Sequence, residues 1–175
     1  STRVSGFTEF RREAWVWQKL QHPTLVRLLG LCWQPFCFVM EPVAYGELPG
    51  YLRAAGPKNV PWSHRLKIAT DVATALNYMH SHNPPIMHRD VKSFNVLLAA
   101  KDPKAPVMAK LADFGLAFVG HQTIGRHVDN PVWLAVEVMA GREYTYKADI
   151  YSLGIILWEL LACAEPFKEF GLEWL

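Results

Sequence analysis

Residues 88–95 read His-Arg-Asp-Val-Lys-Ser-Phe-Asn, and residues 113–115 read Asp-Phe-Gly. Each motif carries one acidic residue, Asp90 or Asp113, with basic, amide or aromatic neighbours. One interpretation is that His88, Asp90 and Asp113 are ordinary polar residues that form hydrogen bonds within loops. The presence of two ordered motifs favours a different interpretation, a site at which acidic, basic and metal-binding groups converge.

Both motifs resemble the catalytic loop and the metal-binding motif of eukaryotic-type protein kinases at every defining position. Phosphoryl transfer depends on positioning and charge neutralisation more than on covalent chemistry by the enzyme. The resemblance implies that Asp90 orients the proton of the attacking hydroxyl and that Lys92 neutralises the transferred phosphoryl group. It also implies that Asn95 and Asp113 bind the Mg²⁺ ions that bridge the phosphates of ATP.

The lysine two residues after Asp90 bears on the substrate. Lys92 follows the pattern of serine/threonine kinases, because tyrosine kinases usually place arginine and alanine in this part of the loop. The resemblance therefore implies transfer of the gamma-phosphate of ATP to serine or threonine hydroxyls of a protein substrate. Two alternatives stay open: a pseudokinase or scaffold that uses the same fold for binding, and a small-molecule kinase of similar fold.

Further residues are implied to surround the nucleotide. Glu13 lies where kinases carry a helix carboxylate that pairs with a strand lysine, although on its own it would be an ordinary solvated charge. Met40 resembles the gatekeeper residue of kinases. The backbone of Glu41 and Val43 would form hydrogen bonds with adenine, and Leu97 would lie beneath the purine.

The resemblance also implies an apolar column that links the two lobes of the kinase fold. Trp17, Leu28, His88 and Phe114 occupy its positions, and Asp149 would anchor its base. Plain core packing predicts much the same burial for the apolar members.

An activation segment is expected from Asp113 to Glu137, and Thr123 is its one hydroxyl residue before Trp133. A phosphate on Thr123 would pair with Arg89 through charge-assisted hydrogen bonds and order the loop. An unmodified, solvated Thr123 is the alternative. Residues 133–137 stand where kinases carry a tryptophan-containing Ala-Pro-Glu motif, here with valine at position 136 in place of proline.

Residues 22–30 and 83–88 resemble the tyrosine-kinase-like group, and most closely the Roco-type kinases that include leucine-rich-repeat kinases. Asn130, which stands where many kinases have threonine, also occurs in that branch. Kinship to Roco proteins implies a GTP-binding domain elsewhere in the same protein.

Hydrophobic spacing predicts helices and short strands in a mixed order. The first helix carries Phe10, Ala14, Trp17 and Leu20 on one face and ends at residues 22–23. Residues 25–29 and 37–40 are expected to form two antiparallel strands around a turn at 34–35, and a hinge and a short helix follow between residues 46 and 57. Ser63 is expected to cap a helix with a continuous apolar stripe, composed of Leu66, Ala69, Val72, Ala73, Leu76 and Met79. A buried helix is expected at residues 147–162.

These expectations combine into a truncated, kinase-like two-lobe fold of the α+β class. Residues 1–43 would be a remnant of the small β-rich N-lobe with the hinge, and residues 44–175 an incomplete, mainly helical C-lobe. The residues before Glu13 are too few for a glycine-rich loop and its strand lysine. We therefore expect the 175-residue chain alone to have little kinase activity and to expose apolar helix faces.

Composition excludes several classes of protein. With 175 residues and 51% hydrophobic side chains, the chain can bury a substantial core. Its 18 basic and 16 acidic residues nearly balance, so no nucleic-acid or membrane-surface partner is expected. The uncharged stretch at 150–158 is too short to span a membrane, which takes roughly 20 residues. Cys32, Cys37 and Cys163 are odd in number, and the first two have no Cys or His neighbours at a zinc-ligand spacing, so we expect free thiols in a reducing, cytoplasmic location.

Overall fold

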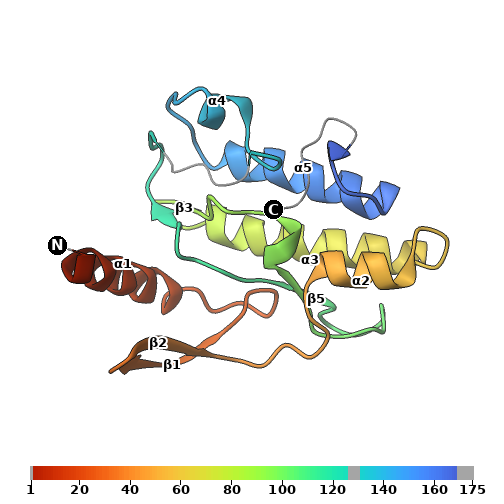
Figure 1. Ribbon diagram of the computed structural model, residues 1–175, viewed down its shortest axis with the longest axis horizontal. Helices are drawn as coiled ribbons and strands as arrows, with labels where there is room; N and C mark the ends of the chain where they lie inside the picture. The colour runs from red at the N-terminus through yellow and green to blue at the C-terminus, as the bar shows by residue number, and fades with distance from the viewer. Residues whose placement is uncertain (1, 126–130, 169–175) are drawn as a thin grey trace.

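The computed structural model describes residues 2–125 and 131–168 and has the expected mixed α+β architecture (Figure 1). In chain order the elements are α1 (Thr2–Trp17), β1 (Leu28–Trp33), β2 (Phe36–Met40), α2 (Leu48–Ala55), α3 (Trp62–His80), β3 (Ile86–Met87), the short 3₁₀ helix η1 (Ser93–Asn95), β4 (Val96–Leu98), β5 (Ala109–Leu111), β6 (Phe118–Val119), α4 (Val136–Met139) and α5 (Lys147–Ala162). Within the described residues, no helix is long and apolar enough to cross a membrane.

Helix α1 lies against the antiparallel β1–β2 hairpin, and aromatic rings hold the two together. The ring of Phe10 stacks on Phe38 with centroids 4.5 Å apart, and it also contacts Trp33 and Phe36 at 5.6 and 5.2 Å. Such aromatic contacts add to the free energy gained from burial alone. The helix and the hairpin were both predicted, although α1 ends at Trp17, before residues 22–23.

The prediction that Leu25 and Val26 belong to the first strand of the hairpin is wrong. Strand β2 pairs with β1 only as far as Leu28, so residues 25 and 26 have no partner in the hairpin. They pair instead with Leu111 of β5: Leu25 forms a parallel bridge with it, and the Val26 amide donates to its carbonyl at 2.9 Å. This pairing joins the hairpin to the rest of the core.

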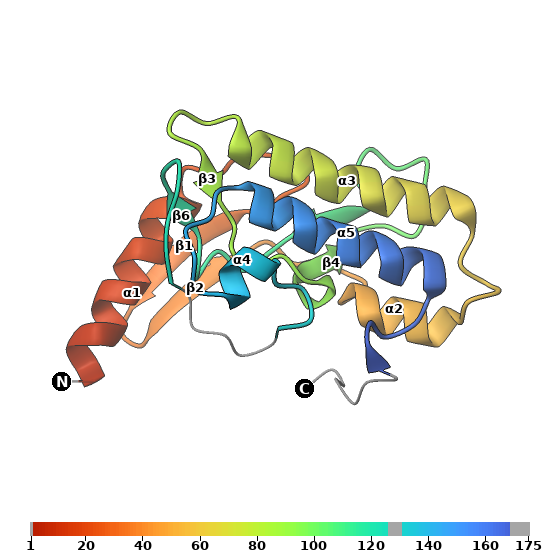
Figure 2. The ribbon, with the colours of Figure 1, turned by 90° about the horizontal axis from the view of Figure 1, so that it is seen from above.

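Helices α3 and α5 pack side by side, as Figure 2 shows, and both contribute side chains to the main hydrophobic core. Two details of α3 differ from the prediction. The helix begins at Trp62 after Pro61, with no side-chain cap, so Ser63 does not cap it. The predicted stripe is not continuous: Leu66 is 63% exposed because Arg65 takes the inward position, and Ala73 is exposed as well.

The inward side chain of Arg65 explains the orientation of α3. Its guanidinium donates to the carbonyls of Pro57, Val60, Leu160 and Leu161 at 2.7 to 3.0 Å. A buried cation is tolerated only where such partners satisfy its donors. The arginine therefore ties the start of α3 to the end of α5, and it sets which residues of α3 face the core.

Helix α5 has the predicted bounds but is buried on one side only. Leu153, Ile156 and Leu160 face the core, whereas Ile150 and Trp158 are 47% and 43% exposed. The chain therefore presents an apolar helix face, as expected from the sequence.

Candidate functional site

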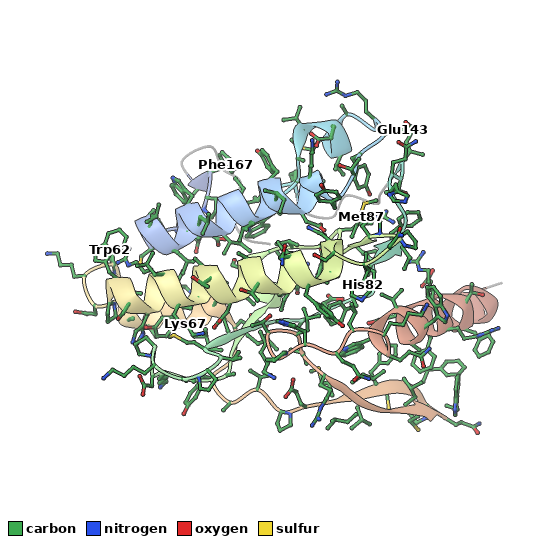
Figure 3. The ribbon with its side chains drawn as sticks, turned by 180° about the vertical axis from the view of Figure 1, so that it is seen from behind. Trp62, Lys67, His82, Met87, Glu143 and Phe167 are labelled. Carbon is green, nitrogen blue, oxygen red and sulfur yellow. The ribbon has the colours of Figure 1, made fainter. Side chains whose placement is uncertain are left out.

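Two strand pairs hold the predicted catalytic motifs beside each other. Residues 88–95 leave β3 and lead into β4, while Asp113-Phe114-Gly115 lies between β5 and β6. Strand β3 pairs with β6, and β4 pairs with β5, so the two connecting segments are adjacent at both of their ends. Met87, labelled in Figure 3, marks the point where the first segment leaves its strand.

Asp90 is the centre of a small polar cluster within residues 88–95. The Lys92 ammonium lies 2.8 Å from Asp90 Oδ2, and the Asn95 amide nitrogen donates to the same oxygen at 3.0 Å. Asn95 also donates to the Asp90 carbonyl at 2.8 Å, which fixes the turn between them. A largely buried carboxylate with a cation and an amide beside it is suited to orienting a hydroxyl group.

Asp113, in the second motif, lies near the polar cluster around Asp90. The Ala112 amide donates to the Asn95 carbonyl at 2.9 Å, which brings the residue before Asp113 against the first motif. Asp113 has a φ of 65°, a conformation that non-glycine residues rarely adopt. Burial lowers the pKa of His88, and the charges of Asp90 and Asp113 both oppose this shift, so both carboxylates lie near one imidazole.

His88 connects the two motifs. It is fully buried, and burial lowers its pKa despite the nearby charges of Asp149, Asp90 and Asp113. Its Nε2 lies 3.1 Å from the Ala112 carbonyl, which only accepts, while its Nδ1 accepts from the Asp90 amide at 3.2 Å. These bonds fit a neutral ring protonated on Nε2.

The ring of His88 ends a column of aromatic side chains. Trp17 and Phe114 are 5.4 Å apart between ring centroids, as are Phe114 and His88, and Leu28 packs against the same core. Asp149 accepts the amides of His88 and Arg89 at 2.8 Å, together with a bond from His80 at 2.8 Å. Contacts thus confirm Trp17, Phe114 and His88 as a column with Asp149 as its anchor, while the place of Leu28 in the column stays a prediction.

Glu13 faces the Asp113 motif from α1. A Cβ atom placed on Gly115 would lie 3.4 Å from Glu13 Oε2 and 3.4 Å from Asp113 Oδ1, so both carboxylates line the same small space. Burial, then the charge of Asp113, raises the pKa of Glu13 to about 7, against the opposing charge of Arg12. The negative charge of Asp113 thus disfavours ionisation of Glu13, and a cation near both carboxylates would be favoured.

The chemistry of the available donor atoms also fits Mg²⁺, which prefers oxygen ligands. Asn95 uses its amide nitrogen on Asp90, so its amide oxygen is the atom suited to a metal ion. Asp113, which supplies carboxylate oxygens, directly follows Ala112, whose amide donates to the Asn95 carbonyl. The residues predicted to hold magnesium are therefore close together and of the right type, and their binding of the metal stays a prediction.

The predicted adenine-binding residues lie on neighbouring elements. Met40 ends β2, Val43 packs against the core, and Leu97 of β4 pairs with Lys110 of β5. Lys110 in turn binds the Glu41 carboxylate at 2.7 Å. Nucleotide contact by these residues stays a prediction.

The side chain of Glu41 has a structural role that the sequence did not indicate. Besides binding Lys110, its carboxylate accepts the Arg27 amide at 2.8 Å. Burial acts to raise the pKa of Glu41, but the hydrogen bonds and charges of Lys110 and Arg27 lower it overall. Glu41, the residue after β2, is thereby tied to β5 next to Leu97.

Glu159 and Ser93 are further residues of the site region that sequence reasoning missed. Glu159 lies fully buried on α5 and accepts bonds from Ser93 Oγ at 2.7 Å and Trp133 Nε1 at 2.9 Å. Burial raises the pKa of Glu159 to about 7, although both hydrogen bonds oppose the shift. The sequence did contain one signal for Glu159: it is an acidic residue flanked by Trp158 and Leu160 in an otherwise apolar stretch.

The activation segment is described up to Gly125 and again from Pro131, and Asn130 lies outside the described residues. Thr123 forms a backbone bridge with Tyr144, with bonds of 3.0 and 2.9 Å. Arg89 donates from Nη2 to the Gly125 carbonyl at 2.9 Å, two residues beyond Thr123. The arginine of the first motif thus contacts the segment that contains Thr123.

Comparison with known proteins agrees with this geometry. The family model described as protein tyrosine and serine/threonine kinase matches residues 1–173. Three relatives come from Dictyostelium discoideum. "Probable serine/threonine-protein kinase pats1" is 43% identical over 95% of this chain, "Cyclic GMP-binding protein C" is 42% identical over 96%, and "Probable serine/threonine-protein kinase roco5" is 45% identical over 94%.

The chain spans 5% of the length of the first of these relatives and 6% of the other two. Matches at 39–41% identity to relatives named roco8, roco7 and roco6 confirm the resemblance to Roco-type kinases. The clustered motifs and the family match over nearly all residues lead to one conclusion: this chain belongs to the protein tyrosine and serine/threonine kinase family.

Proposed function

We propose that the protein containing this chain transfers the gamma-phosphate of ATP to serine or threonine hydroxyls of protein substrates. The observation that carries the proposal is the carboxylate of Asp90, which is held by Lys92 and Asn95 and lies next to the Asp113 motif. Phosphoryl transfer needs this convergence of an acid, a cation and metal ligands.

Each residue has a distinct part in the reaction. Asp90 accepts a hydrogen bond from the substrate hydroxyl and takes its proton as the oxygen bonds to the gamma-phosphorus. The bond between that phosphorus and the bridging oxygen breaks, and ADP leaves. Lys92 stabilises the negative charge on the transferred group.

Asn95 and Asp113 would hold the magnesium ions, which neutralise phosphate charge when bound. Main-chain groups of Glu41 and Val43 would bind adenine, with Met40 beside it and Leu97 beneath it. Glu13 would bind a lysine that orients the phosphates.

Serine/threonine specificity is supported by Lys92 and by the printed names of the relatives. A pseudokinase or scaffold role is less well supported, because Asp90, Lys92, Asn95 and Asp113 are all present and in contact or adjacent. By kinship with Roco-named relatives, we further propose a GTP-binding domain in the whole protein. Free thiols at Cys32, Cys37 and Cys163 support a cytoplasmic location.

The test uses the whole encoded protein, incubated with radiolabelled ATP, Mg²⁺ and a generic protein substrate such as casein. Phosphoamino-acid analysis is expected to show phosphoserine and phosphothreonine. Radiolabelled phosphate found on tyrosine alone would refute serine/threonine specificity. Tight ATP binding without any transfer, in a preparation whose fold is verified by circular dichroism, would instead support the scaffold role.

A further inference from the structure

Cys32 and Cys37 are direct partners near the turn of the β1–β2 hairpin. They stand opposite each other in the antiparallel register, one residue pair away from the Trp33–Phe36 pair at the turn. Opposite residues in such a ladder have Cα atoms about 4.5–5.5 Å apart. Disulfides bridge Cα separations of about 4.4–6.8 Å, so the backbone needs little movement to join these two residues.

The two thiols also share a face of the hairpin. The rings of Trp33 and Phe36 contact Phe10 of α1, and side chains alternate between the faces of a strand, so Cys32 and Cys37 point away from α1. Cys37 is exposed and Cys32 is half-buried. Figure 1 shows this end of the hairpin projecting away from α3 and α5, where a small oxidant can reach it.

The thiols interact with each other as well. Local desolvation, followed by the charge and side-chain hydrogen bond of Cys32, raises the pKa of Cys37. Cys32 Sγ lies 3.4 Å from the carbonyl of Gln34 in the turn. Because the two residues are opposite each other in the register, their sulfur atoms are within reach of each other without a change in the fold.

We propose that Cys32 and Cys37 form a reversible dithiol–disulfide site that is oxidised by hydroperoxides. One thiolate attacks a peroxide oxygen, and the O–O bond breaks to give a sulfenic acid and hydroxide. The second thiol attacks that sulfur, forms the S–S bond and releases water. Overall, two thiols lose two electrons and two protons, and one hydrogen peroxide is reduced to two waters.

The site is separate from the proposed phosphotransfer site. In a reducing compartment such a disulfide is transient, and thiol reductants reverse it. When formed, it links the two strands whose opposite face carries Phe38, the residue stacked on Phe10 of α1. The modification thus restrains the hairpin that supports α1.

The test is peptide mass spectrometry of the whole encoded protein, fully reduced, then treated with hydrogen peroxide and alkylated. No lysine or arginine lies between Arg27 and Arg53, so trypsin releases both cysteines in the single peptide 28–53. We expect this peptide to become lighter by two hydrogen atoms and to carry no alkyl label. Reduction with dithiothreitol before alkylation is expected to restore two labels.

Cys163 provides an internal control, because trypsin places it in the separate peptide 148–168. It is expected to keep its alkyl label at the peroxide dose that closes the Cys32–Cys37 bond. In the variant Cys37→Ser, the peptide 28–53 is expected to gain oxygen at Cys32 or to keep its label. The proposal is overturned if both wild-type cysteines stay labelled, gain only oxygen, or pair with Cys163 or with another molecule.

Discussion

The carboxylate of Glu159 accepts a hydrogen bond from the Ser93 hydroxyl at 2.7 Å, although 66 residues separate the two in the chain. Its second oxygen accepts a hydrogen bond from Trp133, near the end of the expected activation segment. One buried side chain of α5 therefore joins the catalytic loop to that segment. Several consequences of this buried carboxylate can be measured.

Replacing Glu159 with Ala is expected to destabilise the protein by on the order of 4 kcal/mol, because two buried donors lose their acceptor. Glu159→Gln, which keeps one carbonyl oxygen, is expected to cost about half as much. Denaturant unfolding with a single probe gives the comparison. Glu143→Ala, at an exposed position labelled in Figure 3, serves as the control and is expected to change stability by less than about 0.5 kcal/mol. Equal stability of Glu159→Ala and wild type would contradict the role of this carboxylate.

Burial raises the pKa of Glu159 from its ordinary 4.5 to about 7 in the folded state, which predicts a pH dependence of stability. Below pH 4.5 the group is protonated in both states, and between 4.5 and 7 only the folded state keeps its proton. The free energy of unfolding therefore falls as pH rises through this window, by up to about 3 kcal/mol, and is flat above it. Glu13 adds a slope of the same sign. Glu159→Gln is expected to lose part of the slope, and an unchanged slope would argue against the prediction.

Asp149 is expected to be needed to hold the catalytic loop in place. Asp149→Ala leaves the amides of His88 and Arg89, and the ring of His80, without their acceptor. We expect a loss of about 3–5 kcal/mol in unfolding free energy, the usual result of breaking a buried charged network. Hydrogen exchange should increase first at residues 88 and 89. Slow exchange at these two amides in the variant would show that Asp149 does not anchor them.

Phosphorylation of Thr123 is expected to order the activation segment. Arg89 Nε is buried and has no hydrogen-bond partner among the described residues, so a phosphate two residues before Gly125 would find an unused donor. We expect Thr123→Val to lower phosphotransfer by on the order of tenfold. Mass spectrometry of the active wild-type protein tests the modification directly. Full activity with no phosphate on Thr123 would contradict regulation by phosphorylation at this residue.

The chemistry of the site could be predicted from the sequence because its residues are contiguous within two short motifs. Asp90, Lys92 and Asn95 lie within six residues, and a loop of that length brings them together in any fold that buries its ends. The helices at 2–17 and 147–162 were also predictable, since their apolar spacing is regular. In these cases the local sequence pattern alone was enough to predict the structure.

Long-range pairing was not predictable in the same way. Leu25 and Val26 have the composition of a strand, but only the three-dimensional structure shows that Leu111 is their partner. The inward orientation of Arg65 depends on carbonyls of Leu160 and Leu161, nearly a hundred residues away. Glu159 likewise finds its donors far along the chain. Each of these residues takes its position from a partner that local sequence does not reveal.

The account depends most on Asp90 acting within one site together with Asp113. The most direct measurement is the rate of phosphotransfer by the whole encoded protein carrying Asp90→Asn, with Mg²⁺–ATP affinity measured in parallel. We expect the rate to fall by at least about a hundredfold with ATP affinity unchanged, because a base is lost but the phosphates are still bound. Asp102→Asn, on an exposed loop, is the matched control and should retain the wild-type rate. A rate for Asp90→Asn equal to that of the control would contradict the assignment of this site.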